Sequence, residues 1–201
     1  MSWRAVSALL IVAVSGCYGQ DISAGPIQIY LDSQWDAREV DAIRFGMERW
    51  ENATGLDFFD FVGTYDDDEF STEDLDDGRH VVYKIMEPNA DTDYLEGVNL
   101  RRLGLSTENG DYLAGYGLHT DILLFWYNFS DEDISEDRMD YFYYLANLVT
   151  HESGHFLGLG HNSVACDASM MSPNSCAGVN ALIEITDEDI NQICFIYGYG
   201  C

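Results

Sequence analysis

The most informative stretch of this chain is His151-Glu-Ser-Gly-His155-Phe-Leu-Gly158-Leu-Gly-His161, which has the pattern H-E-x-x-H-x-x-G-x-x-H. Residues four apart share one face of a helix, so His151 and His155 can direct their imidazoles at the same metal ion. Glu152 lies about 100° further round the helix, beside that pair but not among the ligands. Glycine accepts the left-handed backbone that ends a helix, so Gly158 predicts a turn that returns His161 as a third nitrogen ligand.

Three histidine ligands with an open fourth position are the arrangement of catalytic zinc. Zinc held this way lowers the pKa of a bound water, and Glu152 would take the proton as that water attacks a peptide carbonyl. The motif therefore predicts a zinc endopeptidase with His151, His155 and His161 as ligands and Glu152 as general base. The alternative is a lipid-anchored, zinc-binding surface protein without catalysis, but such a protein has no chemical need for Glu152.

The composition is that of a folded, acidic protein. A length of 201 residues suggests a single domain, and 47% hydrophobic with 13% aromatic residues is enough for a substantial core. The formal net charge is −27, and Lys84 is the single lysine. This charge argues against nucleic acid and against electrostatic docking on anionic lipid. It suits cationic peptide substrates or, more simply, a solvated acidic surface.

The N-terminus has the features of an export signal. Arg4 precedes an apolar run from Ala5 to Val14 that is too short to span a membrane as a mature helix. The run ends in Val14-Ser-Gly-Cys17, which resembles the lipobox of bacterial lipoproteins. The resemblance implies a signal peptide at 1–16, lipidation of Cys17 and a tether at 17–26, and hence a chain anchored in the cell envelope by its lipid. A plain secretory signal, which would leave the chain secreted, is the alternative.

The remaining cysteines predict disulfide bonds. The chain has five cysteines, and removing Cys17 leaves Cys166, Cys176, Cys194 and Cys201. An even set in an exported chain implies disulfides, with three connectivities allowed for four cysteines. The local pairs Cys166–Cys176 and Cys194–Cys201 are preferred. Zinc binding by these cysteines is the rival interpretation, but the chain contains no C-x-x-C pair.

Periodicity predicts an alternation of strands and helices. Apolar runs and alternating patterns predict strands at 27–31, 58–62, 80–86, 104–107 and 121–126. A first helix, capped by Ser33 or Asp36, carries an apolar stripe of Val40, Ile43, Met47 and Trp50. The arginines of this helix lie off the stripe and are expected to be solvated; they are Arg38, Arg44 and Arg49. A second helix carries core residues from Tyr141 to Val149 and continues into the zinc motif.

An acidic run occupies residues 66–77. Clustered carboxylates suit hard cations, so one interpretation is a calcium-binding loop. The other is an exposed acidic loop, which the lack of EF-hand spacing favours.

Taken together, the motifs resemble the metzincin zinc proteases and, among these, the matrixins. Besides the long histidine motif, Ser169-Met-Met171-Ser-Pro173 is similar to their Met-turn, in which Met171 would form a hydrophobic floor beneath the metal. The stretch 186–198 is similar to the matrixin C-terminal helix, with Thr186 as its N-cap. Asn162 departs from the matrixin pattern, in which serine usually follows the third histidine, and this leaves the subfamily open.

The resemblance implies an α+β fold: a twisted mixed sheet of about five strands with two helices, then a small C-terminal lobe with one helix. It implies a catalytic domain at 27–201, divided into an upper subdomain (27–161) and a lower subdomain (162–201), and a monomer. An extended peptide or protein substrate would pair with an edge strand, for which 103–107 is the candidate.

Overall fold

The fold follows the predicted order of strands and helices. The computed structural model describes residues 22, 24–66, 77–87, 104–108, 120–126, 139–161, 169–172 and 182–198. Its elements in chain order are β1 (Ile27–Asp32), α1 (Ala37–Thr54), β2 (Phe59–Tyr65), β3 (His80–Ile85), β4 (Gly104–Glu108), β5 (Thr120–Phe125), α3 (Met139–Phe156) and α4 (Asp187–Tyr197). All five predicted strands and all three predicted helices are present among these elements.

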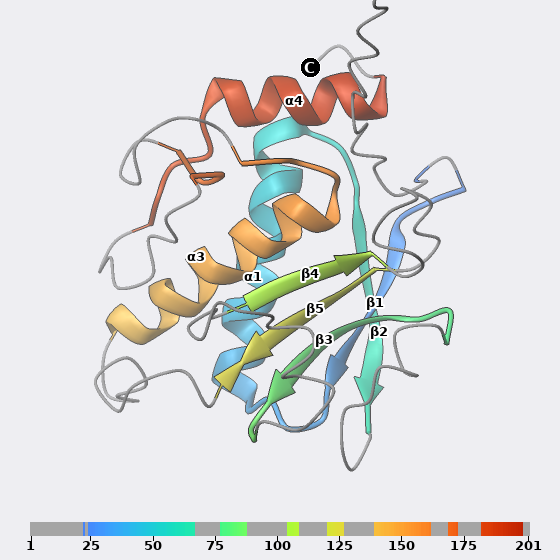
Figure 1. The fold of residues 1–201 in the computed structure, drawn as a ribbon, viewed down its shortest axis with the longest axis vertical. Coiled ribbons are helices and arrows are strands. Elements are labelled where there is room, and N and C mark those ends of the chain that lie inside the picture. Colours follow the sequence, from blue (N-terminus) through green and yellow to red (C-terminus); the bar gives the residue numbers. More distant parts are fainter. Residues whose placement is uncertain are drawn as a thin grey trace, which may run out of the picture.

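The strands form one mixed sheet in the order β2-β1-β3-β5-β4 (Figure 1). β1 pairs in parallel with β2 and β3, and β3 pairs in parallel with β5. Parallel neighbours require a crossover connection, and α1 provides the one between β1 and β2. β4 pairs antiparallel with β5 and ends the sheet, so the strand predicted as the edge is at the edge.

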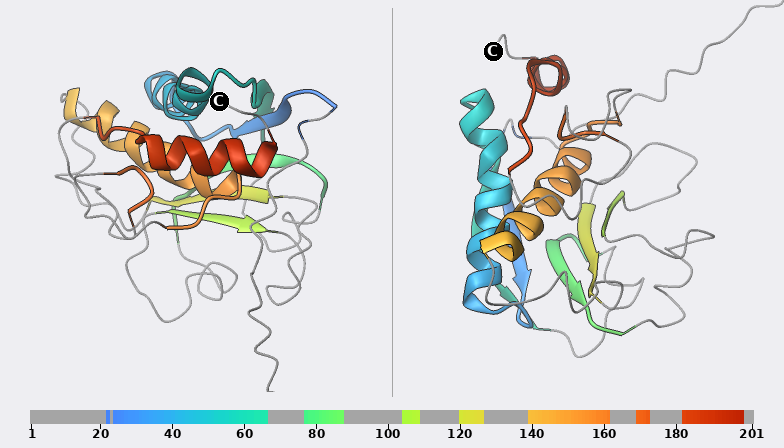
Figure 2. Two further views of the ribbon diagram at one scale, coloured as in Figure 1. Left: turned by 90° about the horizontal axis from the view of Figure 1, so that it is seen from above. Right: turned by 90° about the vertical axis from the view of Figure 1, so that its left-hand side faces the viewer.

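Helices α1 and α3 pack on one face of the sheet (Figure 2). Strand residues alternate between faces, so Val82, Ile122 and Leu124 join the main core beneath the helices. Their neighbours Val81 and Leu123 belong to a smaller apolar cluster on the other face. Together these features confirm the predicted α+β architecture.

Helix α1 begins and ends where local chemistry dictates. The carboxylate of Asp36 accepts hydrogen bonds from the backbone N–H groups of Arg38 and Glu39, both at 2.8 Å. The Glu39 side chain in turn accepts from the Asp36 N–H at 2.9 Å, which completes a capping box. Of the two predicted caps, Asp36 is therefore the one used. Gly55 ends the helix in the left-handed region, at φ 73°.

Helices α1 and α3 cross closely at Gly46. A Cβ at this position would lie 2.7 Å from the Ala146 carbonyl oxygen, so only glycine allows the approach. The Thr150 hydroxyl lies at the same crossing, 2.9 Å from the Gly46 carbonyl oxygen and 2.7 Å from that of Ala146. The crossing fixes α3, which carries the histidine motif, against the rest of the core.

A buried charged cluster joins α1, β3 and α3. The Lys84 ammonium lies 2.9 and 2.7 Å from the two carboxylate oxygens of Glu39, and the Tyr141 hydroxyl donates to the same carboxylate at 2.6 Å. The ammonium also lies over the rings of Trp35 and Trp126, at 5.0 and 4.6 Å from their centroids. The single lysine of the chain is therefore part of the buried core.

Several predicted features lie outside the described residues. These are the signal at 1–16, most of the tether, almost all of the acidic run, and Cys17, Cys166, Cys176 and Cys201. Among the residues that are described, no helix has both the length and the apolar character needed to cross a membrane.

Candidate metal centre

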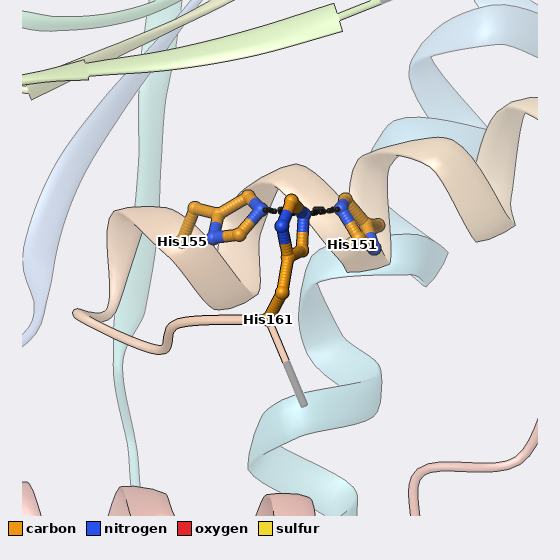
Figure 3. Close-up of side chains that lie close together, drawn as sticks. All are labelled: His151, His155 and His161. Atoms are coloured by element: carbon orange, nitrogen blue, oxygen red, sulfur yellow. Dashed lines mark hydrogen bonds between the residues drawn. The ribbon is translucent and has the colours of Figure 1, made fainter. Parts of the chain in front are cut away.

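The three histidines of the motif converge (Figure 3). His151 and His155 point from one face of α3, and His161 returns toward them from the segment that follows. The Nε2 atom of His155 lies 3.1 Å from that of His151 and 3.0 Å from that of His161, and the third distance is 3.3 Å. The spacing in the sequence therefore predicted the ligand cluster.

The turn that returns His161 has the predicted glycine. Gly158 is in the left-handed region at φ 94°. Its N–H donates to the His155 carbonyl at 2.8 Å, and the Leu159 N–H donates to the Gly154 carbonyl at 2.9 Å. This pair of bonds is a Schellman motif, which satisfies the last carbonyls of the helix while reversing the chain.

Backbone carbonyls fix the tautomers of the two helical histidines. Nδ1 of His151 lies 2.7 Å from the Met170 carbonyl oxygen, and Nδ1 of His155 lies 2.8 Å from that of Leu159. A carbonyl only accepts hydrogen bonds, so each Nδ1 carries the proton and each Nε2 presents a lone pair. Two lone pairs that face each other at 3.1 Å repel, unless a cation lies between them.

The donor set fits zinc. Imidazole nitrogens bind zinc at about 2.0–2.1 Å, and tetrahedral geometry then places two of them about 3.3 Å apart. The observed separations of 3.0 to 3.3 Å match this expectation. His151 is buried, His155 is intermediate and His161 is exposed, so the centre opens to the surface on one side. Zinc is bound by this triad.

Burial favours the neutral, metal-binding form of the imidazoles. The pKa of His155 is lowered to about 4, chiefly by desolvation and then by the neighbouring His151 and His161, while the hydrogen bond to the Leu159 carbonyl acts in the opposite direction. Desolvation also lowers the pKa of His151, although the Met170 carbonyl and the Asp189 carboxylate act in the opposite direction. Neutral imidazole is the form that binds a metal, so the protein environment favours metal binding before any ion arrives.

Met171 lies directly against the histidine-bearing turn of α3. It is fully buried, and a Cβ at Gly154 would lie 2.4 Å from its sulfur and 2.9 Å from Cζ2 of Trp50. Gly154 stands between the two helical ligands in the sequence. The absence of a side chain there lets the methionine pack against α3 at the level of the ligands.

A buried carboxylate anchors the segment 169–172. The Ser169 hydroxyl lies 2.9 and 3.0 Å from the two carboxylate oxygens of Asp189, which is completely buried in α4. Asp189 also accepts from the N–H and the hydroxyl of Thr186, at 2.9 and 2.8 Å, in the capping box that begins α4. Thr186 is therefore the N-cap of α4, as predicted. Through Ser169, Asp189 also holds the segment whose Met170 carbonyl contacts His151, and no pattern in the sequence indicated this link.

Glu152 is buried, with 6% of its surface exposed, and it follows His151 directly on α3. Cys194 is buried on α4.

One expectation was wrong: Arg49 is not a solvated charge. Its guanidinium lies 3.2 Å from both the Asn147 side-chain oxygen and the Thr150 hydroxyl on α3.

The three histidines thus form a zinc centre at the end of a helix that packs on a mixed sheet. The family model for matrixins matches residues 27–198. The chain belongs to the matrixin family of zinc metalloendopeptidases.

Two individual proteins are similar to the chain. It is 39% identical over 54 residues to Metalloendoproteinase 2-MMP of Arabidopsis thaliana, a match that spans 27% of this chain and only 14% of the length of that relative. Among solved structures it is similar to high choriolytic enzyme 1, a hatching enzyme zinc-protease of Oryzias latipes, with a TM-score of 0.46 and 14% identity. That alignment covers 93% of this chain and 97% of the other.

Proposed function

We propose that this chain hydrolyses internal peptide bonds of protein substrates, with zinc on His151, His155 and His161 and with Glu152 as the general base. The observation that carries the proposal is the orientation of the two helical histidines, whose protonated Nδ1 atoms face carbonyls while their Nε2 lone pairs face a common point. Zinc held there supplies Lewis-acid activation of water and of the substrate carbonyl.

The residues of the chain divide the remaining work. Glu152 takes a proton from the attacking water as the water oxygen bonds to the carbonyl carbon. It then returns that proton to the amine nitrogen as the carbon–nitrogen bond breaks. Its burial next to His151 supports this role, because a general base must lie within reach of the metal-activated water. Met171 serves as an apolar floor that holds the ligand-bearing turn in place.

The edge strand β4 is the proposed docking site for the substrate backbone. β4 pairs with β5 along one edge, and no strand of the described residues pairs with its other edge, which we assign to strand addition by the substrate. It also runs beside α3, the helix of the metal ligands (Figure 1). An extended peptide added to β4 would therefore pass the metal centre.

The Glu152→Gln variant tests the catalytic assignment. The amide keeps the size of the side chain but cannot take a proton, so we expect casein cleavage to fall by about 10²–10⁴-fold. Zinc content should remain at the wild-type level. Cleavage by the wild type should also disappear on chelation and return with added zinc. A variant that cleaves casein at the wild-type rate would remove Glu152 from the mechanism, and an inactive, zinc-loaded wild type would favour the catalytically silent binding protein.

Export and lipidation are proposed on separate grounds. The lipobox-like Val14-Ser-Gly-Cys17 supports acylation of Cys17, and the even set of remaining cysteines supports an oxidising compartment. Cys194 is disulfide-bonded, which agrees with that compartment. The pairs Cys166–Cys176 and Cys194–Cys201 remain the preferred connectivity. Mass spectrometry of the mature protein tests both points, through the acyl mass on Cys17 and through the cross-linked peptides of a nonreduced digest.

A further inference from the structure

Arg49 of α1 joins helix α3, which carries two of the metal ligands, to the segment that leads into α4. Its Nη1 lies 3.2 Å from the Asn147 side-chain oxygen and 3.2 Å from the Thr150 hydroxyl, both on α3. Its Nη2 donates to the backbone carbonyl of Ile183, in the segment that leads into α4. Figure 2 shows this segment descending from α4 between α1 and α3. One guanidinium thus bridges three separate parts of the chain.

A further hydrogen bond joins Asn147 directly to Ile183. Asn147 uses the same side-chain oxygen to accept from the Ile183 N–H at 3.1 Å, so both backbone groups of Ile183 are held. Among the described residues, the acceptors of Arg49 are all neutral oxygens. Arg49 is partly buried, and this burial lowers the pKa of its guanidinium. The N–H groups of a guanidinium form a rigid planar fork that reaches acceptors on different sides, whereas the donors of a lysine all lie on one compact ammonium.

Both arms of the bridge lead to His151. The first arm is short, because the Thr150 hydroxyl contacts Arg49 and Thr150 directly precedes His151 in α3. The Thr150 carbonyl also accepts from the Trp50 indole at 2.8 Å. The other arm runs from Ile183 to α4, whose Asp189 holds Ser169. The next residue is Met170, whose carbonyl lies 2.7 Å from Nδ1 of His151. His151 is therefore held from its backbone side and from its ring side by elements that meet at Arg49.

We propose that Arg49 is a positioning residue for the metal: it holds α3 and the segment before α4 at the spacing at which the Met170 carbonyl orients His151. Without it, the two elements can move apart, and the imidazole loses part of the constraint that aims its lone pair. The role lies in zinc affinity rather than in the chemical step. The inference rests on the zinc centre of the proposed function, but its test uses no peptide. The peptidase assignment can therefore fail while this inference stands, and this inference can fail while the peptidase assignment stands.

The test compares the zinc dissociation constants of four proteins, measured by competition with a chromogenic chelator. We expect Arg49→Met to weaken zinc binding by about tenfold, the lower end of the range for residues that orient a metal ligand. Arg49→Lys should fall between this variant and the wild type, because an ammonium cannot span all three acceptors. The control is Arg44→Met on the same helix, where an exposed guanidinium lies 4.8 Å from the centroid of the Phe61 ring. This control should bind zinc as the wild type does.

Thermal unfolding of the metal-free and zinc-loaded forms separates positioning from general stabilisation. A positioning role reduces the gain in Tm that zinc confers, since that gain depends on the affinity. If Arg49→Met lowers both melting temperatures equally and leaves the zinc affinity unchanged, Arg49 only supports the fold and the proposal is wrong. If Arg49→Met does not fold, Arg49→Lys decides: a folded protein with wild-type zinc affinity would overturn the proposal.

Discussion

The two ends of helix α3 hold buried polar side chains in opposite ways. Near its start, Tyr141 donates to Glu39, which also binds Lys84, so that donors meet acceptors at 2.6 to 2.9 Å. At its end, the Nε2 atoms of His151 and His155 are both acceptors and lie 3.1 Å apart. The first cluster is complete within the chain, and the second requires a cation.

This difference separates a structural cluster from a functional one. A buried ion pair with satisfied partners needs nothing more, and breaking it costs folding energy. A group of converging lone pairs is unfavourable in the protein alone and becomes favourable when a metal binds. Substitutions at the histidine end of α3 should therefore change the zinc affinity, and substitutions at the lysine end should change the free energy of unfolding.

The histidine end should give the largest effect on metal binding. We expect His155→Ala to weaken zinc binding by more than about a hundredfold, beyond the range for residues that only orient a ligand. The stability of the metal-free protein should fall little, because the loss of this imidazole also removes the repulsion between the Nε2 atoms. Zinc titration and urea unfolding in the presence of a chelator measure the two quantities. Wild-type zinc affinity in this variant would contradict the assigned ligand set.

The lysine end should respond in the reverse manner. Lys84→Met leaves the Glu39 carboxylate buried without its cation, so we expect a loss of about 3–5 kcal/mol in the free energy of unfolding. The zinc affinity of the molecules that remain folded should be unchanged. Urea unfolding checks the first expectation and chelator competition the second. Arg44→Met serves as the control for removing a positive charge from an exposed site. If Lys84→Met proved as stable as this control, the cluster would not contribute to folding.

The sequence predicted the histidine end and not the lysine end, because only the former is local. Eleven consecutive residues contain the three ligands, the proposed general base and the glycine of the turn. The contacts of Glu39 with Lys84 and Tyr141 instead join residues 45 and 102 positions apart. No spacing in the chain marks such a cluster. Lys84 gave no sign of its role except that it is the single lysine.

The same limit explains the error at Arg49. Because Arg49 lies off the apolar stripe of α1, it was correctly predicted not to pack between α1 and the sheet. Its acceptors on α3 and before α4 lie 98, 101 and 134 residues away, and no pattern within α1 reports them. The strands, by contrast, were predictable from local alternation, and the cap at Thr186 was predictable from residue type. Residue type narrowed the cap of α1 to Ser33 or Asp36, and the structure shows Asp36.

Gly154→Ala should perturb the histidine end through packing alone. The new methyl group would lie 2.4 Å from the Met171 sulfur and 2.9 Å from the Trp50 ring, so one of them must move. We expect a loss of about 1–3 kcal/mol in the free energy of unfolding, as for other overpacked sites. A matched control is Gly160→Ala, where a Cβ would meet nothing within 4 Å. Equal stabilities of the two variants would show that the contact between Met171 and α3 is loose.

The acid dependence of stability should also distinguish the histidine end, with the smallest effect. The pKa of His155 is about 4 in the folded protein and about 6.5 when unfolded. Between these values the unfolded chain binds more protons, so the free energy of unfolding of the metal-free protein should rise with pH across that interval. Urea unfolding at several pH values measures this slope, and His155→Gln should reduce it. An identical slope in this variant would show that His155 does not titrate with folding.

X-ray absorption spectroscopy of the zinc-loaded protein tests the central claim most directly. If the centre is the one described, the metal has three imidazole nitrogens at about 2.0–2.1 Å and one exchangeable oxygen. Bound zinc should number one per chain. A sulfur ligand at about 2.3 Å, or fewer than three imidazoles around the metal, would contradict the account.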